Sequence, residues 1–531
     1  MRPFKKHLLF LIAFFVLATS PCILHQFFVI KSPFNAILVA IHCFVLSYLA
    51  TLIVAFIKPT IVRRIVQALI IIIFSVDFTF NIYCLFELGY LFDAEFAKMV
   101  IDTNPNEAKE FATAMLPINI VLGVLGVFFV FVILGIISTK HNLNLKGKSA
   151  NLAMGFLCLC AAENIYSWNV WHDGPINRIM ELPEYEVPYD LKSFYSTPSI
   201  SLQNEKQTPI NVVLIIGESF TRCHSSLYGY EKNTNPDLDS LKQKGLLYTF
   251  DSIDAPAPST AQAIKYMMST YGLSDTATDK KWYEYTTLVE IMQESGYNCY
   301  WFSNQARGSK HNGISRALAG LCEGQWFLQN EGSEKIDTKK NKLWDVVLVD
   351  SSSTFVRQLP PNQYSFVVYH MMGSHFHFAQ RYPKEFAHFS EKDYLSENQS
   401  HREILACYDN SILYNDHIVA DIINLFSDKD AIVIYLPDHG QVMYRDERQP
   451  DYFAHGLKND PVSYALGVEI PFFVYTSPLF QERHPDTMER IKKRQEEPKS
   501  WNSDNLPYFI MDLIGVTAIN GEAIADKSIL N

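Results

Sequence analysis

Long apolar stretches dominate the first third of this 531-residue chain, and shorter apolar runs separated by polar segments follow them. Five of the long stretches are close to the ~20 residues that a helix needs to cross the hydrocarbon core of a bilayer. These predicted spans cover residues 7–30, 36–57, 65–86, 116–138 and 150–168. We therefore expect a transmembrane domain of five helices at residues 1–169, with a loop at 87–115 between the third and fourth spans.

Basic residues give the orientation of the predicted spans. They precede the first span and lie in two connections, the one between spans two and three and the one between spans four and five: Arg2, Lys5, Lys6, Lys58, Arg63, Arg64, Lys140, Lys146 and Lys148. The positive-inside rule assigns all three segments to the cytoplasm. An odd number of spans then places everything after about residue 169 outside the cytoplasm. The four later spans favour a retained anchor over a cleaved signal peptide for the first span.

The remainder of the chain alternates between strand-like and helix-like patterns. Residues 170–208 contain several prolines and serines and predict a linker, so the soluble domain is expected at residues 209–531. Short apolar runs predict strands at 211–217, 297–303, 364–369, 431–437 and 471–476, and helical patterns separate them at 286–295, 403–426 and 504–514. This alternation predicts an α/β domain with a mainly parallel central sheet.

Hard metal ligands follow two of the fully apolar strands. Glu218 comes directly after residues 211–217, and Asp438 and His439 come directly after residues 431–437. In open α/β sheets, reactive groups gather beyond the carboxyl ends of the strands, so we expect these three side chains to meet. Two carboxylates, an imidazole and a hydroxyl form a set that suits a catalytic Zn²⁺ ion.

A hydroxyl nucleophile is predicted at the segment Ala255-Pro-Ala-Pro-Ser-Thr260, which leads into a helical pattern. A hydroxyl at a helix start faces unpaired N–H groups and the positive end of the helix dipole, a suitable place for a phosphoryl group. Zinc would lower the pKa of this hydroxyl and produce an alkoxide at neutral pH. Ordinary capping of the helix is the alternative role of Thr260. His375 and His455, which lie next to glycines, would hold phosphate oxygens, bind a second metal or protonate the leaving alcohol.

Charge and cysteine content narrow the function further. The formal net charge is −11, and residues 1–170 contain 12 lysines and arginines against 8 acidic residues, so the acidic excess lies in the outer domain. An acidic domain argues against nucleic acid as a partner. Cys223, Cys299, Cys322 and Cys407 lie in an oxidising space that permits disulfides, but the sequence does not give their pairing.

Taken together, the motifs resemble those of the lipid-dependent phosphoethanolamine transferases. The motifs are Gly217-Glu218-Ser219, Leu227-Tyr-Gly-Tyr230 with Thr234-Asn235-Pro236, Thr260, Gly373-Ser-His375, Tyr408-Asp409-Asn410-Ser411, Asp438-His439-Gly440 and His455-Gly456. The resemblance implies a five-span anchor in the bacterial inner membrane and a periplasmic domain of the alkaline phosphatase/sulfatase type.

The resemblance also implies a role for individual residues. It assigns one or two Zn²⁺ ions to the site, with Glu218, Thr260, Asp438 and His439 as zinc ligands and Thr260 also as the nucleophile. His375 and His455 match residues that engage phosphate or a second zinc. Substrate contacts fall on Thr103, Glu107 and Lys310, although the spacing around Lys310 departs from the family pattern and Glu107 equally suits an ordinary solvated helix position.

The implied reaction transfers phosphoethanolamine from phosphatidylethanolamine, a membrane lipid, to an envelope glycan through a covalent phosphothreonine. The acceptor is left open among lipid A, the lipopolysaccharide core and a periplasmic glucan, because no cysteines flank Thr260 and Met99 stands where the family has asparagine. One alternative is a glycerol-phosphate transferase of the lipoteichoic-acid-synthase type. A second alternative is a non-catalytic membrane sensor or transporter.

Overall fold

The computed structural model divides the chain into two compact units, Met1–Glu184 and Tyr185–Asn531, and each unit is described by itself. The structure describes residues 2–28, 32–83, 191–194, 197–202, 210–278, 280–307, 313–329, 344–360, 363–395, 399–444 and 461–531, together with residues 85, 125, 126 and 129.

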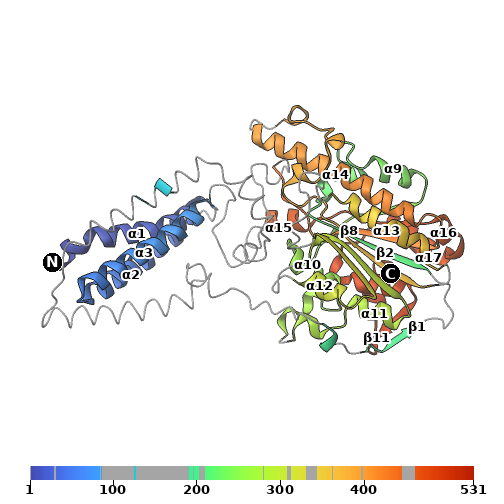
Figure 1. The fold of residues 1–531 in the computed structure, drawn as a ribbon, viewed down its shortest axis with the longest axis horizontal. Coiled ribbons are helices and arrows are strands. Elements are labelled where there is room, and N and C mark those ends of the chain that lie inside the picture. Colours follow the sequence, from blue (N-terminus) through green and yellow to red (C-terminus); the bar gives the residue numbers. More distant parts are fainter. Residues whose placement is uncertain are drawn as a thin grey trace. The chain divides into compact units, whose positions relative to one another are not determined.

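The first unit contains three long helices, α1 (Arg2–Phe28), α2 (Pro33–Phe56) and α3 (Thr60–Tyr83). They overlap the ranges predicted for the first three spans and lie side by side (Figure 1). A small apolar cluster that includes Phe10 and Ile71 packs between them. Within the described residues, one window, Phe10–Phe27, is long and apolar enough to cross a membrane. The five-span domain therefore stays a prediction, because the loop 87–115 and nearly all of the fourth and fifth spans lie outside the described residues.

The second unit is built on a seven-stranded sheet. Its strands, in spatial order, are β3 (Leu247–Phe250), β9 (Phe472–Thr476), β8 (Ala431–Pro437), β2 (Asn211–Gly217), β7 (Ser365–His370), β5 (Asn298–Ala306) and β6 (Gly324–Gln329). Strand β9 runs antiparallel to both of its neighbours, whereas every other neighbouring pair is parallel. The predicted α/β domain is thus present, with a sheet that is mixed at one side.

Helices cover both faces of this sheet. The described helices of the second unit are α9 (Pro236–Gln243), α10 (Thr260–Met267), α11 (Leu288–Glu294), α12 (Ile314–Ala319), α13 (Val346–Gln358), α14 (Gln399–Leu425), α15 (Pro461–Val468), α16 (Pro478–Arg483), α17 (Pro485–Glu496) and α18 (Leu506–Leu513). Helices α13 and α14 lie on one face, and α10, α11 and α12 lie on the other (Figure 1). Short strands β1 (Ile200–Leu202), β4 (Ile253–Asp254), β10 (Trp501–Asn502), β11 (Val516–Ile519) and β12 (Glu522–Ala523) form two small sheets beside it.

The register of β2 and β8 places the candidate ligands at one level. Gly217 pairs with Pro437 at the end of this parallel ladder, and the Asp438 N–H donates to the Gly217 carbonyl at 3.1 Å. The residues that follow both strands therefore leave the sheet side by side. Gly217 is required there, because a Cβ at this position would lie 2.4 Å from the Tyr435 hydroxyl.

No disulfide joins the four cysteines of the second unit in the structure. Cys299 and Cys322 are buried, Cys223 is exposed and Cys407 is partly exposed. The disulfides that an oxidising compartment would permit are thus not formed among these four residues.

Candidate active site

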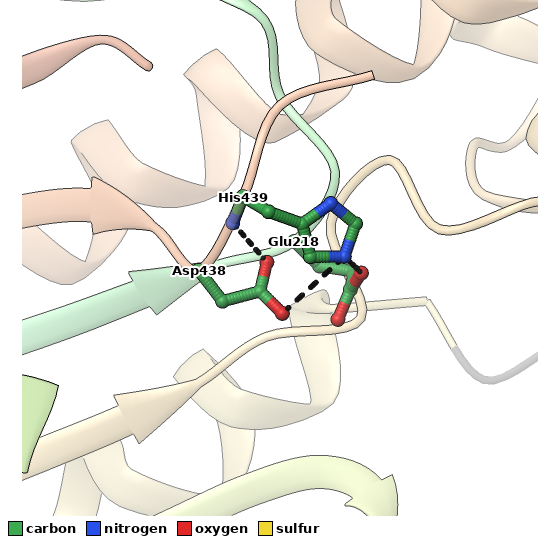
Figure 2. Close-up of side chains that lie close together, drawn as sticks. All are labelled: Glu218, Asp438 and His439. Atoms are coloured by element: carbon green, nitrogen blue, oxygen red, sulfur yellow. Dashed lines mark hydrogen bonds and ion pairs between the residues drawn. The ribbon is translucent and has the colours of Figure 1, made fainter. Parts of the chain in front are cut away.

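Glu218, Asp438 and His439 form a buried cluster at the carboxyl ends of β2 and β8 (Figure 2). One ligand atom of each residue lies within 4.8 Å of the other two. His439 Nε2 is 3.3 Å from Glu218 Oε1 and 3.7 Å from Asp438 Oδ2. The structure thereby brings together the three side chains that the sequence predicted as neighbours.

The ring orientation of His439 directs one nitrogen at both carboxylates. Its Nδ1 donates to the Gly440 carbonyl at 2.7 Å, which leaves the Nε2 lone pair facing Glu218. A nitrogen lone pair opposite a carboxylate oxygen is favourable only with a proton or a metal ion between them. A second ring nitrogen bonded to a carbonyl is also the usual arrangement of a metal-binding histidine.

Buried charge changes the acid strength of all three groups. Burial acts to raise the pKa of Glu218, but the hydrogen bond and positive charge of His439 hold it well below its usual value. Burial and the charge of Glu218 raise the pKa of Asp438 to about 7. Burial acts against protonated His439, but Asp438 and Glu218 raise its pKa to about 9. At neutral pH the two carboxylates therefore favour a positive charge beside them, either a proton on His439 or a metal cation.

The residues of the cluster fit a zinc ion. With Zn–N and Zn–O bonds of ~2.0–2.2 Å, tetrahedral ligands stand roughly 3.4 Å apart. The separations of 3.3 and 3.7 Å measured from His439 Nε2 agree with that spacing. In addition, Asp438 Oδ2 is buried and accepts no hydrogen bond. Two carboxylates would balance the charge of a divalent cation, and His439 would supply a nitrogen donor.

Thr260 is the first residue of α10 and points at this cluster. Its hydroxyl donates to Glu218 Oε2 at 3.2 Å and also lowers the pKa of Asp438. Ser259 is the N-cap residue, and it makes no capping hydrogen bond through its side chain. The capping alternative for Thr260 is therefore wrong, and its hydroxyl is directed at the predicted ligands.

Two residues to which the sequence analysis gave no role in the site complete the surroundings of Glu218. Ser219 Oγ donates to Glu218 Oε1 at 2.7 Å, and Gln305 Nε2 donates to Glu218 Oε2 at 2.8 Å. The Gln305 amide also donates to the Met371 carbonyl at 3.0 Å, which fixes its position. A signal for Gln305 existed, since it follows the predicted strand at 297–303 as a polar residue at the same sheet edge.

His375 follows β7 and is half-buried near the cluster, where its charge contributes to lowering the pKa of Glu218. Its Nδ1 donates to the Phe376 carbonyl at 2.6 Å. The remaining predicted site residues, Thr103, Glu107, Lys310 and His455, lie outside the described residues.

The seven-stranded sheet and the buried cluster at the ends of β2 and β8 define an α/β domain with a candidate metal site. The sulfatase family model matches residues 210–516, and the chain belongs to this family.

Known relatives make the resemblance more specific. The chain is 25% identical over 431 residues to phosphoethanolamine transferase EptC of Escherichia coli O18:K1:H7, covering 74% of this chain and 72% of that protein. It is also 25% identical over 405 residues to phosphoethanolamine transferase EptA of Helicobacter pylori, covering 72% and 71%. The resemblance to phosphoethanolamine transferases predicted from the motifs is thus confirmed.

Solved structures support the same fold. The integral membrane protein lipooligosaccharide phosphoethanolamine transferase A (EptA) from Neisseria meningitidis matches with a TM-score of 0.67 at 16% identity, covering 98% of this chain and 97% of that one. The C-terminal periplasmic domain of EptC from Escherichia coli, solved as a complex with Zn, matches with a TM-score of 0.54 at 23% identity, covering 63% and 90%. At these identities the matches show the fold.

Proposed function

We propose that this protein transfers phosphoethanolamine from phosphatidylethanolamine to an envelope glycan, with Thr260 as the nucleophile. The observation that carries the proposal is the Thr260 hydroxyl, 3.2 Å from Glu218 Oε2, which belongs to a buried cluster of two carboxylates and an imidazole. The similarity to enzymes named phosphoethanolamine transferases supports the choice of transferred group. We further propose that the helices of the first unit anchor the protein in the bacterial inner membrane, with the second unit in the periplasm.

In the proposed reaction, Glu218, Asp438, His439 and Thr260 would hold zinc, which would supply Lewis acidity and lower the pKa of the Thr260 hydroxyl. The Thr260 oxygen attacks the phosphorus of phosphatidylethanolamine. Diacylglycerol leaves with the phosphoester oxygen and takes up one proton, and phosphoethanolamine stays bonded to Thr260. The start of α10 presents N–H groups and a positive dipole end to the phosphoryl oxygens.

In the second step, a glycan hydroxyl or phosphate attacks the phosphothreonine and the threonine oxygen leaves. His375, which is half-buried, would meet the phosphate or move a proton to the leaving oxygen. We assign His455 a similar role, and we assign Thr103, Glu107 and Lys310 to substrate contact, by resemblance. The acceptor is lipid A, the lipopolysaccharide core or a periplasmic glucan. One or two zinc ions serve the site.

The proposal is tested with the purified full chain, Zn²⁺ and phosphatidylethanolamine labelled in its head group, by following diacylglycerol release and labelled glycan. Thr260→Ala should lower transfer by roughly 10³-fold or more, because no oxygen remains to attack phosphorus. Ser259→Ala is the matched control, since the neighbouring hydroxyl makes no capping bond. Full transfer by Thr260→Ala contradicts the proposal.

The same assay distinguishes phosphoethanolamine transfer from the alternative functions. Supplying phosphatidylglycerol in place of phosphatidylethanolamine tests the glycerol-phosphate transferase reading. Faster diacylglycerol release from phosphatidylglycerol would reject the phosphoethanolamine donor while keeping Thr260 as nucleophile. Release from neither lipid by the zinc-loaded chain would favour a non-catalytic role.

A further inference from the structure

The motif Tyr408-Asp409-Asn410-Ser411 on α14 contains no cluster ligand, yet every one of its side chains is buried and hydrogen-bonded to a loop. The partners are Ser219 and Thr221 for Tyr408; His224, Tyr230 and Tyr394 for Asp409; Phe389 for Asn410; and Ser374 for Ser411. One turn of one helix thus joins the segments that follow Glu218 to the segment that carries His375.

Tyr408 holds the turn directly after Glu218. Its fully buried hydroxyl donates to the Ser219 carbonyl at 2.8 Å and accepts the Thr221 N–H at 3.0 Å. Ser219 has a φ of +53°, in the left-handed region that residues with a Cβ seldom adopt. Such a conformation persists only when its surroundings enforce it, and the Tyr408 hydroxyl binds the Ser219 carbonyl and the Thr221 N–H directly after it.

The conformation of Ser219 in turn arranges the candidate metal ligands. From this turn, Ser219 Oγ donates to Glu218 Oε1 at 2.7 Å, and the Ser219 N–H donates to Asp438 Oδ1 at 3.3 Å. Both carboxylates are therefore oriented by a residue whose backbone Tyr408 holds in place. Relaxation of Ser219 toward a common backbone conformation would redirect both bonds.

Ser411, one turn further along α14, holds the second loop. Its Oγ lies 2.9 Å from Ser374 Oγ, and the Ser374 N–H donates to the Glu218 carbonyl at 3.0 Å. Ser374 immediately precedes His375. Asp409 fixes this turn of α14, because its buried carboxylate accepts from His224 at 2.6 Å, Tyr230 at 2.7 Å and Tyr394 at 2.5 Å.

We propose that Tyr408 and Ser411 are positioning residues, which hold Glu218 and Asp438 in the spacing that a divalent cation requires and hold His375 beside them. The proposal rests on the zinc site of the proposed function. It concerns the affinity of the site, and zinc binding therefore tests it without reference to turnover.

The primary test measures the zinc dissociation constant of the purified full chain by competition with a chelating dye. Tyr408→Phe keeps the ring and removes both hydrogen bonds, and we expect zinc binding to weaken by about 10–100-fold. Tyr228→Phe is the matched control, because the Tyr228 hydroxyl also donates to a carbonyl and accepts an N–H, both of Phe472, which is not a residue of the cluster. We expect this control to bind zinc like the unaltered protein.

A second pair of variants tests the left-handed turn itself. Ser219→Ala and Ser219→Gly lose the same hydroxyl, but only glycine adopts the left-handed conformation without strain. With Tyr408 present, the two variants should differ little in zinc affinity. In the Tyr408→Phe background, Ser219→Gly should bind zinc several-fold more tightly than Ser219→Ala. Equal affinities in that background contradict a role through Ser219.

Ser411→Ala removes the hydroxyl that bonds to Ser374 and to the Tyr408 carbonyl, and it keeps both hydrogen bonds of the Tyr408 hydroxyl. We expect a smaller loss of zinc affinity than the about 10–100-fold loss of Tyr408→Phe, because the Ser374 N–H still holds the Glu218 carbonyl. If Tyr408→Phe does not fold, Ser411→Ala decides the question alone. Wild-type affinity in every variant that folds overturns the proposal. An unaltered protein that binds no zinc rejects the proposed function instead.

Discussion

Substitution of Gln305 tests whether the hydrogen bonds to Glu218 determine the zinc affinity of the proposed site. Its Nε2 donates to Glu218 Oε2 at 2.8 Å and to the Met371 carbonyl at 3.0 Å. Glu218 is 1% exposed, so water does not replace a lost donor easily. Gln305→Leu removes the donor while keeping similar bulk.

The magnitude follows from the type of bond. A hydrogen bond to a charged group contributes about 1.5–3 kcal/mol. Because 1.4 kcal/mol corresponds to a tenfold change in an equilibrium constant, zinc affinity should fall by roughly 10–100-fold. Thr260 donates to the same oxygen at 3.2 Å, and this bond remains, so Glu218 loses one of its two donors at Oε2.

The assay is zinc competition with a chelating dye on the purified full chain. Gln293→Leu is the matched control, because the Gln293 amide likewise donates to one carbonyl, of Leu321, and one carboxylate, of Glu323, both at 2.9 Å and away from the cluster. Zinc binding by Gln305→Leu within twofold of the unaltered protein, with Gln293→Leu equal to both, would refute the reasoning.

Three further predictions concern strain, pH and metal removal. Gly373→Ala should lower the apparent unfolding temperature more than Gly229→Ala. Both glycines have a positive φ, but a Cβ at Gly373 would lie 2.9 Å from the Glu218 nitrogen, whereas a Cβ at Gly229 would meet no atom within 4 Å. Equal losses of the two variants in thermal melts would count against this prediction. Zinc affinity should fall as the pH is lowered from about 9 toward 7, because the pKa of His439 is raised to about 9 and a proton must leave Nε2 before this nitrogen binds metal. Isothermal titration at several pH values should show proton release on zinc binding. A zinc affinity that does not change with pH would contradict this prediction. Chelation should abolish transfer and Zn²⁺ should restore it, whereas full activity after exhaustive chelation argues against a metal-dependent nucleophile.

The sequence predicted the centre of the sheet better than its edges. The continuous apolar runs at 211–217 and 431–437 coincide with β2 and β8, since strands buried on both faces carry no polar interruption. Strand β6 was missed, because its segment Gly-Gln-Trp-Phe-Leu-Gln forms one edge of the sheet and shows no clear alternation. The reversed direction of β9 has no local signature, because parallel and antiparallel strands share the same side-chain period.

The candidate ligands were predictable for a similar reason. Glu218, Asp438 and His439 follow strands that happen to be neighbours, and the edge rule brings them together. The contacts of Gln305 and Tyr408 were not predictable in the same way, because both residues bond to segments that are distant in the sequence, with no characteristic spacing. The direction of the Thr260 hydroxyl required the coordinates, since a capping residue and a residue that faces a metal site can be of the same type at the start of a helix.

The most direct test of the account is peptide mass spectrometry of zinc-loaded protein incubated with phosphatidylethanolamine and no acceptor. The account predicts one phosphoethanolamine group covalently attached at Thr260, absent from Thr260→Ala and released when acceptor glycan is added. A phosphoethanolamine group on another residue, or one that persists in Thr260→Ala, would contradict it.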